Sequence, residues 1–348
     1  MRLLTAYDTT FLGQALTIDV ATPIDSTGTP GLVASTPDCS EIWWPAANGV
    51  FSYRVADGSV RQAVEGLGPV RGLVPDGDGS IVALAGLGSG AALDRVDLTT
   101  GDLARVMRSD VSHNQWAVAA LLDRGEIAIA TVDVGSDTSG ETTHLSTVGL
   151  YDVGTGESLT GSARSSAAFS QLATCGSPSR LFALGVAPDD GPGTRLIEIT
   201  DDGFAESSVQ VSRPVASSPP PDWSAEPEGG FAISSDCRYV YFLAGGLWRF
   251  DREHGRTLAL PATPAAIALD PRQDVLYLDS PSQNRIEALD LHTFASSVVA
   301  TGVPFVDQML VTQDGKLVIG GRHGLDVGVI DLASGATRRL WEGSELNL

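Results

Sequence analysis

The stretch VGVIDLASGATRRL at residues 327–340 decides the fold of this 348-residue chain, because variants of it recur along the sequence. Each copy has an alternating apolar segment that ends near Asp, then a short turn, then a second segment. Such alternation around a turn is typical of a β-hairpin. The other copies are LDRVDLTTGDLARV (93–106), VGLYDVGTGESLTG (148–161), LWRFDREHGRTLAL (247–260), IEALDLHTFASSVV (286–299), and the weaker VFSYRVADGSVRQAV (50–64) and RLIEITDDGFAESSV (195–209).

Another hairpin precedes each copy, as in FAISSDCRYVYFLAG (231–245), so two hairpins make one four-stranded unit. The aligned aspartates recur at roughly 40 to 55 residues, which is the period of β-propeller blades. They are Asp97, Asp152, Asp251, Asp290 and Asp331. Apolar runs such as VYFL and IAIATV indicate strands buried on both sides, as packing between blades requires. We therefore predict an all-β, seven-bladed β-propeller of four-stranded antiparallel blades, with eight blades as the less favoured alternative.

The blades are expected to occupy residues 31–343, followed by a tail at 344–348. Residues 1–30 form a surplus hairpin, because LLTAYDTTFLGQALTI resembles the second hairpin of a blade. This hairpin either latches the ring closed, covers an exposed strand edge, or is half of an eighth blade.

The stretch LPATPAAIALDPRQDVLYLDSPSQNRIEALDLHTFASSVVATG (260–302), with VTQDGKLVIGGRHGLDVGVIDLASG after it, resembles the repeats of the YVTN and quinoprotein-dehydrogenase-like propellers, relatives of WD-repeat folds. The resemblance covers the blade scaffold from about residue 31 to 342, although the WD dipeptide is absent. It implies a seven-bladed fold. It does not imply one activity, because this superfamily includes electron-transfer enzymes, lyases, lactonases and binding scaffolds.

The charge of −21 excludes nucleic acid as the expected partner, because phosphate binding needs a basic face. No window reaches the 18 or more apolar residues of a membrane helix, so no membrane insertion is expected. The three cysteines are widely spaced, which indicates neither a disulfide framework nor a zinc site. The protein is expected to be cytoplasmic if Met1 is native, and exported if a leader has been removed.

Ligands of propellers usually bind where the B–C and D–A connections of several blades gather, with strands A to D counted outward in each blade. His113, His144 and His323 fall on this predicted face and are candidate acids or bases, or metal ligands with Asp307 or Asp222. The alternative is that they are exposed loop histidines without a role. The candidate ligand-binding residues of the same face are Arg71, Gln115, Trp116, Asp222, Trp223, Arg285 and Asp307.

Three other features have structural explanations. Trp43 and Trp44 lie inside a strand and are expected to pack in the core or at a blade edge. His254 and His292 are expected to be solvated turn residues on the opposite face. PDGDGS (75–80) lacks the Gly and Glu of a calcium loop, so it is interpreted as a tight turn between strands. Cys39 and Cys237 occupy the glycine-like position of equivalent turns.

The sequence lacks a phosphate-binding loop, a GxSxG elbow, an HExxH motif and a CxxCH haem site. The favoured function is a binding or interaction scaffold for a protein, peptide or glycan partner, with no cofactor evident. The alternative is a lyase or lactone hydrolase assisted by a divalent cation. A quinone-type oxidoreductase is third.

Overall fold

The computed structural model describes residues 2–342 except 7–15, 21–33, 36–39, 47–48, 55, 58, 68–69, 76–79, 86–91, 109–114, 122–125, 137–141, 153–154, 156, 160–162, 166–167, 177–179, 188–192, 201–202, 210–229, 244–245, 271, 304–305, 313–314 and 322–325. These residues form antiparallel β-strands and one short 3-10 helix, η2 (Pro281–Gln283). No helix among them is long and apolar enough to cross a bilayer. The predicted all-β class is confirmed. The chain divides into two compact units, unit 1 (1–109 with 265–348) and unit 2 (110–264).

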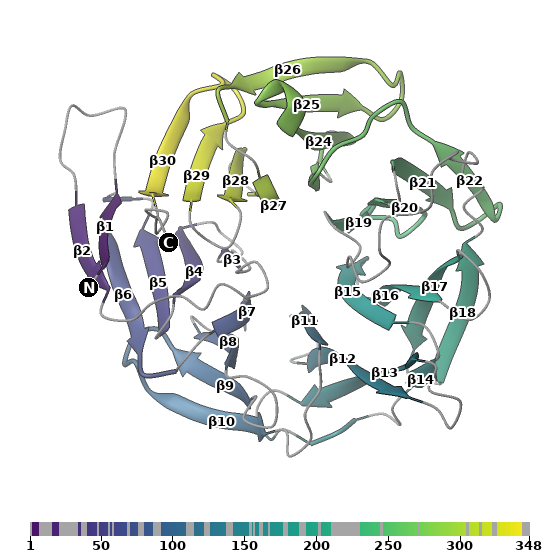
Figure 1. The fold of residues 1–348 in the computed structure, drawn as a ribbon, viewed down its shortest axis with the longest axis horizontal. Coiled ribbons are helices and arrows are strands. Elements are labelled where there is room, and N and C mark those ends of the chain that lie inside the picture. The colour runs from purple at the N-terminus through teal and green to yellow at the C-terminus, as the bar shows by residue number, and fades with distance from the viewer. Residues whose placement is uncertain are drawn as a thin grey trace. The chain divides into compact units, whose positions relative to one another are not determined.

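The described part of unit 1 contains four sheets, of which three have four strands and one has six (Figure 1). The strands follow one another in chain order across each four-stranded sheet. They are β3 (Ala34–Ser35), β4 (Glu41–Ala46), β5 (Gly49–Arg54) and β6 (Val60–Glu65); β7 (Val70–Pro75), β8 (Ser80–Ala85), β9 (Ala92–Asp97) and β10 (Leu103–Arg108); β23 (Ile267–Asp270), β24 (Val275–Ser280), β25 (Arg285–Asp290) and β26 (Ser296–Thr301); and β27 (Val306–Val311), β28 (Lys316–Gly321), β29 (Asp326–Asp331) and β30 (Thr337–Glu342) with β1 (Arg2–Ala6) and β2 (Leu16–Val20).

Unit 2 contributes three more four-stranded sheets among its described residues. These are β11 (Gln115–Leu121), β12 (Glu126–Ser136), β13 (Thr142–Asp152) and β14 (Ala163–Ser165); β15 (Ala168–Cys175), β16 (Arg180–Ala187), β17 (Gly193–Thr200) and β18 (Gly203–Val209); and β19 (Phe231–Ile233), β20 (Tyr239–Leu243), β21 (Leu247–Asp251) and β22 (Arg256–Ala259). Each sheet is therefore the predicted pair of hairpins, with strands A to D in order.

Burial falls from the second strand of a sheet to the fourth. Val240 to Leu243 of β20 are all buried, whereas the residues of β22 are mostly exposed. Strands buried on both faces are covered by neighbouring sheets, and the cores of both units lie between consecutive sheets. In unit 1, for example, Tyr277 of β24 and Leu317 of β28 belong to one apolar cluster. Trp43 and Trp44 are each 1% exposed, so their predicted place in the core is confirmed.

The recurrent aspartates shape the turn between strands C and D. One carboxylate oxygen of Asp97 accepts hydrogen bonds from the backbone N–H groups of Thr99 at 2.7 Å and Thr100 at 3.0 Å. A short Asx turn of this kind needs Asp or Asn at the end of the strand, which explains why the spacing of the aspartates follows the sheets. The same capping bonds occur at Asp152, Asp251, Asp290 and Asp331.

The N-terminal hairpin lies on the outer edge of the last sheet of unit 1. Strand β1 pairs with β2 along its whole length and with β30 at Thr5 opposite Glu342. The edge of β30 is therefore covered in part by another strand, which limits pairing with foreign chains. On β30, the guanidinium of Arg338 also lies 4.9 Å from the ring centre of Tyr53 on β5, so the last sheet contacts the first.

The spacing of the cysteines indicates no disulfide framework, but Cys175 and Cys237 are bonded to each other, so this interpretation is corrected for these two residues. Cys237 has a φ of +59°, and Gly315 has a φ of +80° at the same place in its own sheet, so the glycine-like position is confirmed for Cys237. Cys39, in the corresponding turn of the first sheet, lies outside the described residues. Sequence spacing gave no sign of the bond because the two cysteines are 62 residues apart.

Candidate functional site

Antiparallel strand order sorts the connections of every sheet onto two ends. The A–B and C–D turns leave one end, which we call the turn end, and the B–C connection and the chain to the next sheet leave the other, which we call the loop end. The start of strand A and the start of strand C mark the loop end of a sheet. Each predicted site residue that falls in a described strand lies at or near the start of strand A or strand C, in both units.

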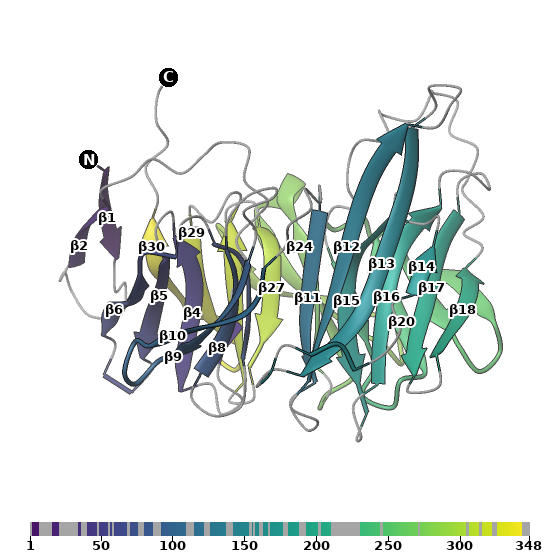
Figure 2. The same ribbon diagram turned by 90° about the horizontal axis from the view of Figure 1, so that it is seen from below.

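In unit 2, three predicted residues lie at the loop end of the sheet β11–β14. Gln115 and Trp116 are the first residues of β11, opposite Val132 and Thr131 of β12. His144 is the third residue of β13 and lies opposite Val134. Strands β12 and β13 have 11 residues each and extend beyond the other strands of unit 2 (Figure 2). At the loop end of this sheet, strands β12 and β13 thus form a long hairpin, and His144 is one of its paired residues.

In unit 1, Arg71 is the second residue of β7, Asp307 is the second of β27, and Arg285 opens β25. Arg285 is the only one of them whose side chain the structure describes. Its guanidinium forms an ion pair with the carboxylate of Glu287, which also accepts a hydrogen bond from the Ser280 hydroxyl at 3.3 Å. The positive charge of Arg285 is therefore neutralised within its own sheet.

The backbone before Arg285 is fixed by Asn284. This residue has a φ of +47°, and its carbonyl accepts hydrogen bonds from the N–H groups of Gly302 at 2.8 Å and Val303 at 3.2 Å. Asn tolerates this left-handed conformation better than most residues. At the loop end of the sheet β23–β26, backbone hydrogen bonds consequently fix the position of Asn284.

A buried carboxylate that sequence reasoning missed lies at the same end of this sheet. Asp279 of β24 is completely buried, and its carboxylate accepts a hydrogen bond from the backbone N–H of Val306 on β27 at 3.2 Å. The carboxylate thus links two consecutive sheets of unit 1, since a buried charge needs hydrogen-bond partners. Nothing in the sequence distinguishes Asp279 from the other aspartates of the chain, which has thirty.

The remaining predicted residues lie outside the described part of the chain. They are His113, His323, Asp222 and Trp223. Their roles, and the joint site that they would form with the residues above, stay predictions.

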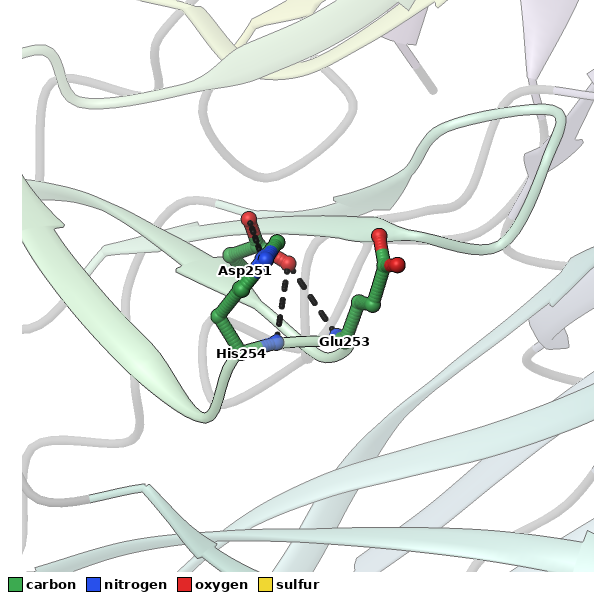
Figure 3. Close-up of side chains that lie close together, drawn as sticks. All are labelled: Asp251, Glu253 and His254. Atoms are coloured by element: carbon green, nitrogen blue, oxygen red, sulfur yellow. Dashed lines mark hydrogen bonds and ion pairs between the residues drawn. The ribbon is translucent and has the colours of Figure 1, made fainter.

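The described residues contain one group that could supply three metal-ligand atoms, and it lies at the turn end. Asp251 closes β21, and Glu253 and His254 follow it in the C–D turn, with their ligand atoms within 4.8 Å of one another (Figure 3). The imidazole Nδ1 lies 3.0 Å from a carboxylate oxygen of Asp251. His254 is 52% exposed, as expected for a solvated turn residue.

Arg238 offsets part of the negative charge of this group. Its guanidinium lies 3.2 Å from the Asp251 carboxylate and 3.0 Å from that of Glu253. Burial raises the pKa of Asp251, but hydrogen bonds from Arg238 and His254 outweigh that effect and lower the pKa to about 2. A metal ion would have to compete with this guanidinium, which already pairs with both carboxylates of the turn.

No family model matches the chain, and no curated protein matches it in sequence. Solved structures match it in fold. Hydrazine synthase of Kuenenia stuttgartiensis has 11% identity and a TM-score of 0.60, over 92% of this chain and 98% of that chain. Puromycin hydrolase, in an S511A mutant complex, has 14% identity and a TM-score of 0.61, over 92% of this chain and 54% of that chain. AztD of Citrobacter koseri has 11% identity and a TM-score of 0.53, over 98% and 94%.

These three proteins have β-propeller-type folds, and the stacked four-stranded sheets of this chain are of the same type. At such low identity the likeness concerns the fold alone. Two of the neighbours are named as enzymes, so the comparison does not separate a binding role from a catalytic one.

Proposed function

We propose that this protein is a binding scaffold: a seven-bladed β-propeller of the YVTN and quinoprotein-dehydrogenase-like type, whose loop end engages a protein, peptide or glycan. In this proposal residues 31–343 form the blades, and the hairpin within residues 1–30 latches onto the last blade. The seven four-stranded repeats of the described residues and the pairing of β1 with β30 support this organisation.

The difference between the two ends of the sheets carries the proposal. At the turn end the C–D turns are short and satisfy their own polar groups through the aspartate caps. The loop end has the extended hairpin β12–β13 and the long connection between Val209 and Phe231. Long connections on a rigid scaffold are where binding surfaces are usually found, because their residues are not needed for the fold.

Binding of the full-length chain to a peptide array and a glycan array tests the proposal. We expect Gln115→Ala with Trp116→Ala, both at the start of β11, to weaken the strongest interaction at least about tenfold, as the loss of a polar and an aromatic contact does. Arg238→Ala with His292→Ala changes the turn end and is the matched control, which should bind like the wild type. If both variants lose the same affinity, the ligand does not bind specifically at the loop end, and the proposal is contradicted.

The same protein sample separates binding from metal-assisted catalysis. A scaffold copurifies with no stoichiometric metal ion. A lyase or lactone hydrolase that uses His113, His144 or His323 would hold about one divalent ion per chain and would lose it when those histidines are changed to Ala. The second result would replace the scaffold with the enzyme.

A further inference from the structure

A covalent bond joins two consecutive sheets of unit 2 at equivalent places. Cys175 is the last residue of β15, at the A–B turn of its sheet, and Cys237 lies in the A–B turn of the next sheet. Their Cα atoms are 5.5 Å apart, as in ordinary disulfides. Among the described residues, no strand of one sheet pairs with a strand of the other. The disulfide therefore links the two sheets covalently where no backbone ladder joins them.

Both sulfur-bearing residues are part of the apolar core of this junction. Cys175 is 8% exposed and Cys237 is 2% exposed, in a cluster that includes Phe182, Val240 and Phe250. A reducing thiol has to reach a sulfur atom in line with the bond. Reduction of the native protein therefore requires that the two sheets first move apart.

The junction also carries a charge where other sheets have an apolar residue. The residue after the aspartate at the end of strand C is a buried leucine at Leu98 and Leu291, but it is Arg252 here. The guanidinium of Arg252 lies 4.4 Å from the ring centre of Phe182 and pairs with Glu198 of β17 in the neighbouring sheet.

Arg252 also contacts the turn that carries Cys237, because it donates a hydrogen bond to the backbone carbonyl of Cys237 at 2.5 Å. Burial lowers the pKa of the Arg252 guanidinium, and Glu198 opposes that shift. A partly buried ion pair adds little net stability compared with a leucine of similar size, since both charges lose hydration. This junction therefore depends on its covalent bond more than an apolar junction would.

The backbone of Cys237 gives an independent indication that the cysteine is there for the bond. Its φ of +59° is a left-handed conformation, which a residue with a side chain adopts at a cost and glycine adopts freely. Gly315 has the same conformation in the equivalent turn. The turn itself therefore does not require a cysteine, and the side chain of Cys237 is used in the contact with Cys175.

We propose that the Cys175–Cys237 disulfide is a redox-sensitive latch between the sheets β15–β18 and β19–β22, and that the protein closes it in an oxidising compartment. One cysteine thiolate attacks a disulfide donor such as glutathione disulfide and releases one glutathione thiol. The second cysteine displaces the other glutathione, so two protein thiols are oxidised and one disulfide donor is reduced to two thiols. In a reducing compartment the latch stays open.

Thiol titration of the full-length protein in urea tests whether the latch forms. Reduced protein should show three reactive thiols, and protein refolded with glutathione disulfide should show one, which belongs to Cys39. Peptide mapping should then find Cys175 linked to Cys237. Three free thiols after refolding, or Cys39 in the linked pair, would overturn the proposal.

Urea unfolding with and without dithiothreitol tests what the latch does. For a loop of 62 residues, opening the bond should raise the unfolding equilibrium constant on the order of a thousandfold. Cys39→Ser should respond to dithiothreitol like the wild type, whereas Cys237→Gly, which keeps the turn conformation, should not respond. If dithiothreitol does not change the unfolding midpoint of the wild type, the proposed latch is overturned. This comparison uses the wild type alone, so it does not depend on whether a variant folds.

Discussion

Substitution of Gly335 by alanine should disturb the packing of one sheet of unit 1 against the next. Gly335 lies in the C–D turn between β29 and β30, with a φ of +71°, and a Cβ there would lie 2.7 Å from the carbonyl oxygen of Val299 on β26. A left-handed alanine costs about 1–2 kcal/mol, and forcing an atom into a packed contact costs about 1–3 kcal/mol more. We expect Gly335→Ala to lower the free energy of unfolding by about 2–5 kcal/mol.

Gly101→Ala is the matched control in the same unit. Gly101 has a φ of +77°, and its N–H donates to the carbonyl of Asp97 at 2.8 Å, as that of Gly335 does to Asp331 at 2.8 Å. No atom lies within 4 Å of the Cβ that alanine would add at Gly101. The free energy of unfolding of this variant should therefore fall only by the cost of a left-handed alanine, about 1–2 kcal/mol.

Urea titration followed by tryptophan fluorescence measures both losses, because Trp43 and Trp44 are buried in unit 1. The difference between the two variants isolates the contact between the turn of one sheet and the outer strand of its neighbour. If Gly335→Ala and Gly101→Ala lower the free energy of unfolding equally, the close contact between Gly335 and Val299 of the neighbouring sheet is contradicted.

Three further predictions concern the turn end and its charges. The capping bonds lower the pKa of Asp97, Asp290 and Asp331 in the folded chain, so their stabilisation is present above the ordinary aspartate pKa of 3.8 and is lost as the pH falls through the lowered pKa values; the urea midpoint should drop on acidification below pH 3.8, and less in Asp331→Asn, which keeps the cap without titrating. Arg252→Leu should cost less than about 1 kcal/mol and Arg252→Ala about 2–3 kcal/mol in the same assay, because leucine fills the junction without a buried charge; the reverse order would refute the description of this junction. Because Arg238 already pairs with both carboxylates of the turn after β21, EDTA should leave the urea midpoint unchanged, and a lower midpoint in EDTA would reveal a structural metal ion.

The repeat could be predicted from the sequence because each feature of it has a local cause. A strand that alternates, an aspartate that caps the next two or three N–H groups, and a glycine that closes the turn all lie within a few residues, as at Asp331 and Gly335. The same locality explains why Trp43 and Trp44 could be placed in the core: they lie inside an apolar strand of a recognisable copy.

The contacts between sheets could not be predicted in this way, since they join residues that are far apart in the chain. Cys175 and Cys237 each occupy an ordinary turn, and nothing in their spacing indicates that they meet. Arg252 and Glu198 are separated by 54 residues, and the aspartate of the Arg238 ion pair resembles every other capping aspartate. One signal was present in the sequence: an arginine follows the aspartate of LWRFDREHG, where leucine follows it in three other copies.

Small-angle X-ray scattering of the full-length chain in solution tests most directly whether all seven sheets belong to one propeller. A single compact body of 348 residues gives a radius of gyration of about 20 Å. Two separately folded units joined by linkers would give about 25 Å or more, with a second maximum in the distance distribution. The first result is expected; the second would contradict the propeller and the loop-end binding surface that depends on it.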